Sequence, residues 1–418
     1  MDKKIKIDVR SEIGELEAVI IHTPGPEVEN MTPGNAERAL YSDILNLTVA
    51  QKEYSRLEEI LGRFTKVFRV KDLLVETLNN SRVKETLVER ICSNDDIGDI
   101  KEYLLEQSRE ELAGLLIEGV VMQKNTLTRF LSRERYALPP LHNFFFTRDA
   151  AIPMLDYVLI SRMANKVRER ESIILETIFD FSGFFNTKTH STFTANPLAT
   201  IEGGDVLVAR EDILIIGNGS RTSVQGIDLI LEILKARKKN KIHIIVQELP
   251  AGPESFIHLD MIFTLLDKDF CMVYEPVIYR TSKYQTVHIT IDNGKVSSIR
   301  EEKNIPETLS KLGMDIKPVF CGGESDIWTQ EREQWHSGAN FFALAPGKVI
   351  GYARNSHTLD QMSKNGFEII NDQDIISGRV DPNQHKKMMI TLDGSELPRG
   401  GGGARCMTMP LKRKAVNW

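Results

Sequence analysis

The chain has 418 residues, of which 41% are hydrophobic and 27% charged, and its formal net charge is -6. These values are typical of a globular protein with a sizeable core, and the acidic balance argues against nucleic-acid binding. No apolar stretch approaches the roughly 20 residues that a membrane span needs, and the N-terminus lacks the pattern of a signal peptide. Four widely spaced cysteines without a C-x-x-C pair predict neither a zinc site nor a disulfide framework. We therefore expect reduced thiols and a cytoplasmic location.

The first part of the chain changes character after one strand. Leu16 to Thr23 is rich in branched residues and is followed by Pro24-Gly25-Pro26, which predicts a strand and a turn. No proline occurs between Pro33 and Pro139, and leucines and isoleucines recur at helical spacing between positions 71 and 130. We expect several amphipathic helices there, inserted into an otherwise α/β chain.

After Pro139-Pro140 the pattern becomes strand, turn, strand, repeated several times, with a helix predicted from Gln225 to Ala236. A recurring supersecondary unit indicates a repeat arrangement around an axis, where polar residues at equivalent positions would converge. For any single position, an ordinary polar turn residue is the simpler interpretation. The polar residues that open the hairpins are Asp149, Glu202, Asp205, His258, Asp260 and Asn340.

His258 and Asp260 form the most informative pair in this set. Residues i and i+2 of a strand point to the same face, so the imidazole and the carboxylate would project into one space. A lone histidine is more often a core or surface residue, but the long apolar run after Asp260 favours a site. A metal site is a minor alternative, because H-x-D alone lacks the further ligands that zinc or iron needs.

The other polar positions are individually weak signals. Glu202 precedes a glycine pair that allows close approach of backbone or ligand, although a simple glycine turn entering a strand is the favoured interpretation of this motif alone. Asp149 stands before an apolar strand with Phe146 three residues earlier. Arg168 lies in a charged run typical of a solvated helix face, and Arg221 would ordinarily be a loop arginine.

The C-terminal segment carries the strongest candidate nucleophile. Four consecutive glycines, from Gly400 to Gly403, free the backbone for close approach to a ligand, and Cys406 follows soon after. Thiols react as thiolates, and a cationic neighbour such as Arg405 favours that form. The alternative is a glycine-rich loop with a small, buried cysteine, and this stretch alone does not decide between them.

Taken together, the motifs F-T-R-D, E-G-G-D-V, H-L-D and G-x-R-C-M-x-M-P, in this order, resemble the bacterial arginine deiminases of the pentein, or guanidine-modifying, superfamily. The resemblance runs nearly end to end. It implies an α/β fold, a five-fold pseudosymmetric α/β-propeller with an inserted helical bundle. Residues 1–70 and 140–418 would form the catalytic propeller and residues 71–139 the helical insertion.

The resemblance also implies roles for individual residues. Cys406 matches the nucleophile, His258 the general acid and base, and Glu202 the carboxylate that supports the histidine. Asp149 and Asp260 match the carboxylates that grip the guanidinium of the substrate. The residues matching those around the amino-acid end of the substrate are Asn143, Phe146, Arg168, Arg221 and Gly400. Gly401 stands where many members carry an arginine that moves with substrate binding.

The implied function is hydrolysis of free L-arginine to L-citrulline and ammonia through a covalent amidino-cysteine intermediate, as the first step of arginine fermentation. We expect no metal and no organic cofactor, no nucleic-acid or membrane partner, and a homo-oligomer, either a dimer or a tetramer. Two alternatives stay open at this stage: amidino transfer to a second amine, and a non-catalytic arginine-binding protein. The complete set of five catalytic matches argues against the second alternative.

Overall fold

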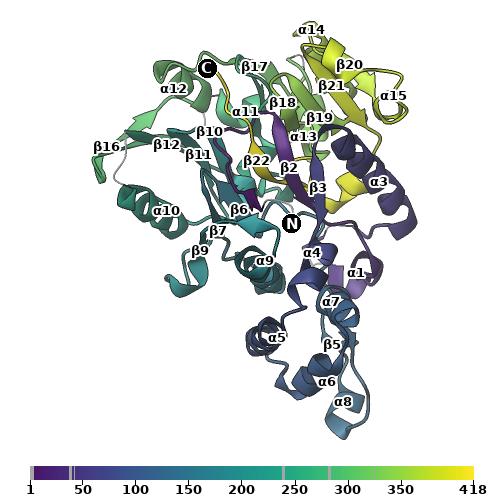
Figure 1. The fold of residues 1–418 in the computed structure, drawn as a ribbon. Coiled ribbons are helices and arrows are strands. Elements are labelled where there is room, and N and C mark those ends of the chain that lie inside the picture. The colour runs from purple at the N-terminus through teal and green to yellow at the C-terminus, as the bar shows by residue number, and fades with distance from the viewer. Residues whose placement is uncertain (1–3, 37–39, 42, 238–240, 281–283, 325) are drawn as a thin grey trace.

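The computed structural model describes residues 4–418 apart from 37–39, 42, 238–240, 281–283 and 325, and it has a mixed α/β fold (Figure 1). In this part of the chain, five sheets have three or more strands. Each contains an antiparallel pair whose inner strand also pairs in parallel with a third strand. The strands of the five sheets, named within each sheet in the order in which they pair, are β22 (Met409–Arg413), β2 (Leu16–Ile21), β3 (Lys66–Arg69); β6 (Ala151–Met154), β7 (Tyr157–Ile160), β9 (Thr189–Ser191); β10 (Val206–Arg210), β11 (Ile213–Asn218), β12 (Ile242–Glu248), β15 (Thr286–Asp292), β16 (Lys295–Glu302); β13 (Phe263–Leu265), β14 (Phe270–Val273), β17 (Lys317–Phe320); and β18 (Phe342–Ala345), β19 (Lys348–Tyr352), β21 (Met388–Leu392), β20 (Glu368–Asn371).

Helices connect the parallel strands of these sheets, because a parallel pair requires a crossover connection. The helix predicted from Gln225 is present as α10 (Val224–Ala236), and its N-terminus is capped by the Ser223 side chain. The helices of these connections are α3 (Leu47–Phe64) before β3, α9 (Glu169–Phe181) before β9, α10 before β12, α11 (Glu275–Ile278) and α12 (Ile305–Lys311) before β17, and α14 (Ser356–Lys364) and α15 (Asp372–Ile376) before β21. The hairpin strands are almost entirely buried, as expected for strands covered on both faces.

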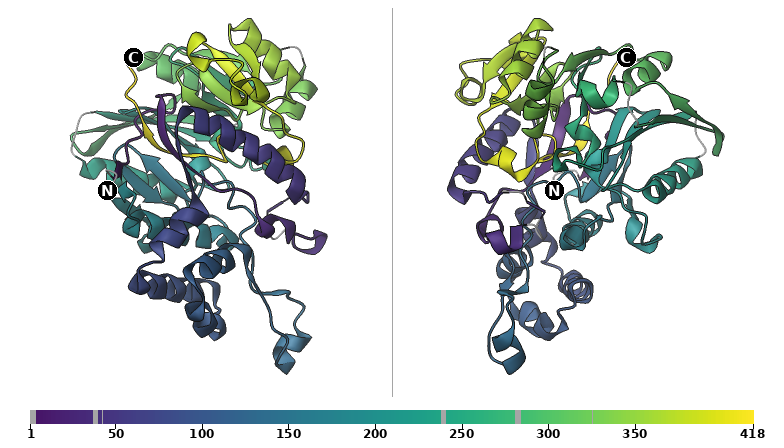
Figure 2. Two further views of the ribbon diagram at one scale, coloured as in Figure 1. Left: turned by 45° about the vertical axis from the view of Figure 1, so that its right-hand side comes forward. Right: turned by 180° about the vertical axis from the view of Figure 1, so that it is seen from behind.

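The helices expected between positions 71 and 130 are present, and they lie together at one end of the molecule (Figures 1 and 2). They are α4 (Val70–Thr77), α5 (Ser81–Asp95), α6 (Lys101–Glu106) and α7 (Arg109–Glu118). Ser108 and Glu111 form a capping box that fixes the start of α7. A short hairpin of β4 (Val120–Val121) and β5 (Tyr136–Leu138), carrying α8 (Leu127–Leu131), was not foreseen from the sequence.

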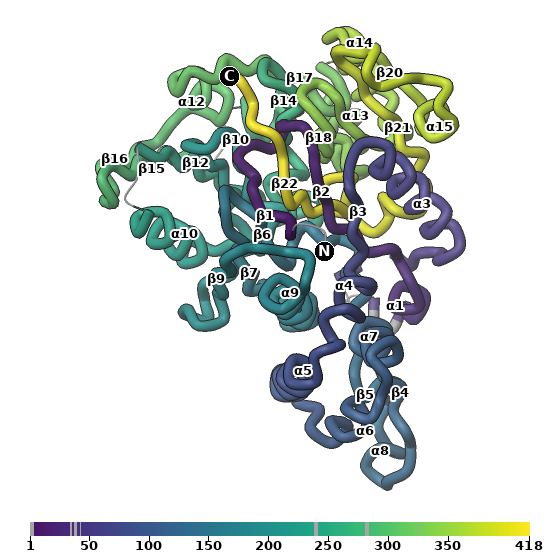
Figure 3. Tube along the Cα trace, in the orientation of Figure 1, coloured from purple at the N-terminus to yellow at the C-terminus, as the bar shows by residue number. Residues whose placement is uncertain are grey.

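The two ends of the chain meet in one sheet. β2 pairs antiparallel with β22, so the segment after Cys406 lies beside the first long strand of the chain (Figure 3). Met407 and Met409 are fully buried there, which anchors the glycine-rich segment in the core. No helix in the described residues has both the length and the apolar character needed to cross a bilayer.

Short elements complete the fold. They are β1 (Ile5–Lys6), which pairs with β8 (Phe185–Asn186), the helices α1 (Pro26–Glu29), α2 (Pro33–Ala36) and α13 (Ile327–Trp335), and the 3-10 turns Gly98–Ile100, Lys166–Arg168, Thr192–Thr194, Gly203–Asp205, Glu254–Phe256, Leu259–Met261, Pro382–Gln384 and Leu397–Gly400. The 3-10 turn at Leu259 corrects one prediction: residues 258–260 do not continue a strand. A strand would require ladder hydrogen bonds, whereas here the Met261 N–H bonds back to the His258 carbonyl.

Candidate active site

Five polar segments occupy the same position in the five sheets, a few residues or fewer before the edge strand of an antiparallel pair. In four sheets this pair is a hairpin, and in the fifth it joins β22 to β2 from the other end of the chain. They are Asp149 before β6, Glu202 to Asp205 before β10, His258 to Asp260 before β13, Asn340 before β18, and Cys406 before β22. Each apolar, buried strand thus begins shortly after a polar segment. The hairpins therefore determine where these side chains lie.

Hydrogen bonds connect the five segments in a closed circuit. They are Gly203 N–H to the Asp149 carbonyl (3.1 Å), Leu259 N–H to Asp205 Oδ1 (2.9 Å), Asn340 Nδ2 to the Asp260 carbonyl (3.2 Å), Arg405 N–H to Asn340 Oδ1 (2.9 Å), and Arg148 N–H to the Cys406 carbonyl (3.1 Å). The circuit begins and ends in the segment that contains Asp149. The polar residues that open the hairpins thus do lie together, as the repeat pattern predicted.

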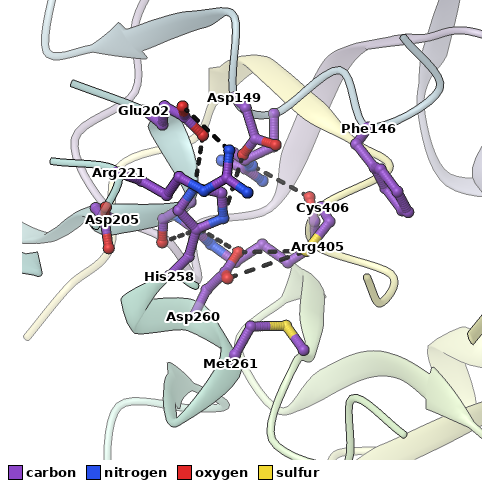
Figure 4. A network of polar contacts seen from close by, with 12 residues as sticks. Phe146, Asp149, Glu202, Asp205, Arg221, His258, Asp260, Met261, Arg405 and Cys406 are labelled. Carbon is purple, nitrogen blue, oxygen red and sulfur yellow. Dashed lines mark hydrogen bonds and ion pairs between the residues drawn. The ribbon is translucent and has the colours of Figure 1, made fainter. Parts of the chain in front are cut away.

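His258 and Glu202 are joined by a direct side-chain hydrogen bond within this circuit. The histidine Nε2 lies 2.9 Å from Glu202 Oε2, and its Nδ1 lies 3.8 Å from Asp149 Oδ1. All three side chains are buried. The sequence spacing of His258 to Glu202 and Asp149 is large, so only the folded chain brings these residues together (Figure 4).

The glycine pair after Glu202 is required by this packing. A Cβ on Gly204 would lie 2.5 Å from the His258 ring, and one on Gly203 would lie 2.0 Å from the Arg148 carbonyl oxygen. Any larger residue would displace the imidazole or the neighbouring backbone. The glycines therefore allow close approach and are more than turn residues.

The two carboxylates determine the charge of the histidine. Burial alone would lower the pKa of His258, but Asp149 and the hydrogen bond to Glu202 outweigh it and raise this pKa to about 9. Conversely, although burial opposes it, the hydrogen bond and charge of His258 lower the pKa of Glu202. At neutral pH the pair is therefore an imidazolium held by a carboxylate.

The Cys406 thiol lies on the other side of the same space. Its Sγ is 3.8 Å from Asp260 Oδ2 and 4.0 Å from Asp260 Oδ1 (Figure 4). Asn340 Nδ2 lies 3.2 Å from the same sulfur. Burial and the carboxylates of Asp260 and Asp149 raise the pKa of this thiol well above its ordinary value. The sulfur is therefore protonated in the free protein.

Arg405 does not activate the thiol in the way that its place in the sequence suggested. Its guanidinium donates to both carboxylate oxygens of Glu12, at 3.0 and 3.1 Å, and to Asp260 Oδ2 at 2.8 Å. Its charge is thus balanced by two acids, and its lowering of the thiol pKa is outweighed by burial and by the nearby carboxylates. Arg405 instead holds the Asp260 carboxylate in place through the hydrogen bond to its Oδ2.

A sequence model of the family described as "Arginine deiminase" matches residues 37–413, which is most of the chain. The chain belongs to the arginine deiminase family.

Comparison with individual relatives supports this family membership. An arginine deiminase of Bacillus cereus is 32% identical, and the match covers 99% of this chain and all of the relative. One of Borrelia duttonii is 30% identical over 98% of each chain. Among solved structures, the N-terminal domain of ArgZ, bound covalently to a reaction intermediate, matches with a TM-score of 0.53 at 14% identity. That match covers 95% of this chain and 98% of the ArgZ domain, and it shows similarity of fold.

Arg168 and its neighbours correct the interpretation of a solvated helix face. Arg168, Arg170 and Glu171 are all buried. Arg168 donates to Asp149 Oδ2 at 2.8 Å and to Glu171 Oε2 at 2.8 Å. Burial raises the pKa of Glu171 to about 7, against the opposing effect of Arg168. Of the two arginines expected near the substrate carboxylate, this one is engaged by protein carboxylates.

Arg221, the second of these arginines, is differently placed. Its Nη1 is buried, has no hydrogen-bond partner among the residues that the structure describes, and lies 3.9 Å from Glu202 Oε1. The side chain lines a pocket of about 100 Å³ together with Trp335, Arg399, Gly400 and Gly401. Gly401 has a φ of +84°, which favours glycine at this position, while Arg399 on the same pocket is paired with Glu396. Arg221 therefore presents positive charge to the open side of the site.

Phe146 and Asn143 lie beside the glycine run. Phe146 stacks against Phe145, with ring centroids 4.1 Å apart, and a Cβ on Gly402 would lie 2.5 Å from its ring. Asn143 is buried, and its carbonyl accepts a hydrogen bond from Arg168. Phe146 thus lies against the glycine run, and the roles that the family resemblance implied for both residues stay predictions.

The trio Asp149, Glu202 and His258 has the residue types and the proximity of a metal site, since their ligand atoms lie within 4.8 Å of one another. The guanidinium of Arg168, however, already lies 2.8 Å from Asp149 and 4.0 Å from Glu202, and Arg221 adds a second positive charge. A divalent cation would be repelled by both arginines.

Several residues of the site were missed or given no role by sequence reasoning. Glu12 and Glu171 hold Arg405 and Arg168, and Asp205 anchors the turn that carries His258. Asn340, which contacts the thiol, had been noted only as a polar residue that opens a hairpin. Its position before a hairpin strand, shared with the other site residues, was the available signal.

Proposed function

We propose that this enzyme hydrolyses free L-arginine to L-citrulline and ammonia, with Cys406 as nucleophile. Membership of the arginine deiminase family supports the reaction. The observation that carries the mechanism is one buried site containing a thiol, an imidazolium and two carboxylates. These are the groups needed to hold and attack a planar cation.

The substrate guanidinium would lie between Asp149 and Asp260. A guanidinium presents its N–H groups in a fixed plane, so paired carboxylates can hold it with parallel, charge-assisted hydrogen bonds. Asp149 Oδ1 is buried and accepts no hydrogen bond from the described part of the chain, which suits it to accept from the ligand. Holding the plane orients its central carbon toward the thiol and makes the attack effectively unimolecular.

Substrate binding would activate the thiol. The carboxylates of Asp260 and Asp149 raise the thiol pKa, and a bound cation between them would cancel this effect. Cys406 would then lose its proton to solvent once arginine is in place. The neutral thiol of the free enzyme would be protected from unproductive oxidation or alkylation.

Two half-reactions follow. The thiolate forms a bond to the guanidinium carbon and gives a tetrahedral adduct. The C–N bond to one terminal nitrogen then breaks, and the His258 imidazolium gives that nitrogen the proton it needs to leave as ammonia. The remaining amidino group stays on sulfur. Neutral His258 next takes a proton from water as the oxygen attacks the same carbon, and the C–S bond breaks to release citrulline and the thiolate.

The distal end of arginine would lie toward the small pocket. Arg221 offers an unpartnered nitrogen to the α-carboxylate. Arg168 would join it by exchanging part of its contact with Asp149 when Asp149 turns to the guanidinium. Asn143, Phe146 and Gly400 would complete this end of the site. We propose no metal and no organic cofactor, since every step is supplied by these side chains.

The larger arrangement is also a proposal. The five hairpin-based sheets and the closed circuit between them support a five-fold pseudosymmetric propeller, formed by residues 1–70 and 140–418, with residues 71–139 as an inserted helical bundle. We further propose that the chain acts in the cytoplasm as a homo-oligomer, a dimer or a tetramer. Light scattering coupled to size exclusion would give the mass directly.

The decisive experiment is to mix the enzyme with arginine, quench in acid and weigh its cysteine peptides. An added amidino group on the Cys406 peptide is expected, with the buried Cys271 peptide unmodified as the internal control. Cys406→Ala should form no citrulline. Citrulline formed by that variant at the parent rate would refute the covalent mechanism, and no citrulline from the parent with arginine as sole substrate would refute hydrolysis in favour of amidino transfer.

A further inference from the structure

Asn340 connects three parts of the site through one side-chain amide. Its Oδ1 accepts the N–H of Arg405 at 2.9 Å, and its Nδ2 lies 3.2 Å from the Asp260 carbonyl oxygen and 3.2 Å from Cys406 Sγ. The residue is 1% exposed. The backbone just before the nucleophile, the turn of Asp260 and the sulfur itself are therefore all contacted by one group.

The two backbone contacts fix which end of the amide faces the sulfur. The Arg405 N–H is a donor and requires the amide oxygen, while the Asp260 carbonyl is an acceptor and requires the amide nitrogen. A flipped amide would oppose donor to donor and acceptor to acceptor at these two contacts. The group directed at Cys406 is consequently an N–H donor, and its second hydrogen faces two sulfur atoms, Cys406 Sγ at 3.2 Å and the more distant Met261 Sδ at 3.7 Å.

We propose that Asn340 is a further catalytic residue, which donates a hydrogen bond to the Cys406 sulfur and stabilises its thiolate form. The proposal rests on the function given above, because it needs Cys406 to react as a thiolate. The amide would stabilise the thiolate in two steps: the attack on the substrate, and the final step, in which the C–S bond breaks and the thiolate returns.

The surroundings of the sulfur explain why a donor is needed there. The nearby carboxylates of Asp260 and Asp149 repel a thiolate, and Arg405 is committed to Glu12 and Asp260. Tyr352, which also faces this region, has a raised pKa from burial and stays neutral. A bound guanidinium would offset the carboxylates, but the citrulline that leaves in the final step is neutral, so the returning thiolate has no bound cation beside it. A fixed neutral donor would serve the sulfur throughout.

The packing around Asn340 leaves little freedom for another role. A Cβ on Gly403 would lie 2.5 Å from Asn340 Oδ1, so the glycine run allows the loop to close over the amide. The amide is thus held by backbone on two sides and directed at the sulfur on the third. This is the arrangement expected of a preorganised donor.

Asn340→Asp tests the donor without changing the shape of the side chain. One oxygen still accepts from Arg405, but the other presents an acceptor to the sulfur. We expect kcat to fall roughly 100-fold or more, the order seen when one preorganised donor is removed, with a smaller change in KM. The pH at which iodoacetamide alkylates Cys406 half-maximally should rise, measured after subtraction of the reaction with Cys406→Ala.

Asn355→Asp is the matched control. Asn355 is also buried and also donates to a backbone carbonyl, that of His336 at 3.0 Å, but its hydrogen bonds do not involve the sulfur. Its variant should keep the parent kcat and the parent alkylation profile. Asn340→Ala provides a second test if the aspartate variant does not fold, since it removes the donor without adding charge, and its alkylation profile should also shift to higher pH.

The outcomes separate this inference from the proposed function. If Cys406→Ala is inactive while folded Asn340→Asp or Asn340→Ala keeps kcat within threefold of the parent and the parent alkylation profile, Asn340 is not a catalytic donor and the inference is wrong. If Cys406→Ala is itself active, the proposed mechanism fails first. A loss of kcat without any shift of the alkylation profile would assign Asn340 a purely structural role and would also overturn the inference.

Discussion

The chemistry of the site depends on charges that are buried and paired. His258, Glu202 and Asp149 are each ordinary titratable residues, but burial removes the solvent that would otherwise screen them. The consequence is an imidazolium at neutral pH next to a protonated thiol. This is opposite to the ion pair of many thiol enzymes, and it makes the cationic substrate itself part of the activation.

The raised pKa of His258 predicts the alkaline limit of activity. The imidazolium must be present to expel ammonia, and it persists until the pH passes about 9. We expect the single-turnover rate of amidino-enzyme formation to fall above that pH, as measured by rapid acid quench. The same shift stabilises the fold: the contribution is fully present below about 6.5 and is lost as the pH rises through about 9. A rate that stayed flat to pH 11 would contradict the role of His258.

Gly204 gives a second prediction at this scale. Gly204→Ala would bring a methyl group within 2.5 Å of the His258 ring and displace the imidazole from Glu202. A displacement of this size is expected to lower kcat about 100-fold. Gly62→Ala, at a helix position with no neighbour within 4 Å, is the control and should retain full activity. Equal activity of the two variants would show that the ring tolerates the added methyl group.

At the scale of elements, the apolar strands and the turns before them have different roles. The strands are buried supports, and the turn before each of them carries the polar residues of the site. Helices such as α10 and α9 cover the sheets, and most of the reacting groups do not lie on these helices. The helices α5, α6 and α7 lie at the end of the molecule opposite α14 and β20 (Figure 1), and their stability should be separable from catalysis.

The capping box of α7 tests this separation. Ser108→Ala removes the side chain that accepts the Glu111 N–H, and loss of such an N-cap costs about 1 kcal/mol. We expect urea to unfold the variant, or its helical part, at lower concentration while kcat stays at the parent value. Ser55→Ala, an exposed serine within α3, is the control and should not destabilise the protein. A large loss of activity in Ser108→Ala would show that the helices are coupled to the site.

At the scale of the whole molecule, the two ends of the chain are joined twice. β2 pairs with β22, and Glu12 near the N-terminus accepts two hydrogen bonds from Arg405 near the C-terminus. The buried ion pair continues to Asp260, so the closure of the chain also fixes a carboxylate of the site. Stability and catalysis are therefore coupled at this point.

Glu12→Gln should reveal that coupling. Breaking one partner of a buried ion pair commonly costs about 3–5 kcal/mol, and the Asp260 carboxylate would lose its support. Despite burial, Arg405 and Arg148 lower the pKa of Glu12 to about 2. The stability it contributes is present above about 4.5 and is lost as the pH falls through about 2. We expect a lower free energy of unfolding at pH 7 and a reduced kcat.

Glu15→Gln is the control for that variant. Glu15 pairs with Lys414 on the surface and also bridges the two ends of the chain, but solvent screens the pair. Its variant should match the parent in chemical denaturation and in activity. If Glu12→Gln behaved like Glu15→Gln, the buried network would be dispensable.

The sequence by itself determined the elements and the identity of most reacting groups. Apolar periodicity predicted β2, α10 and the hairpins after position 140, because local burial patterns are written in adjacent residues. The ordered motifs around Asp149, Glu202, His258 and Cys406 indicated the family. Tertiary structure alone decided which charges are paired: Arg405 with Glu12 across nearly the whole chain, Arg168 with Asp149 and Glu171 inside the core, and Asn340 against the thiol. Pairing and burial depend on distances between residues far apart in sequence, and no local pattern encodes them.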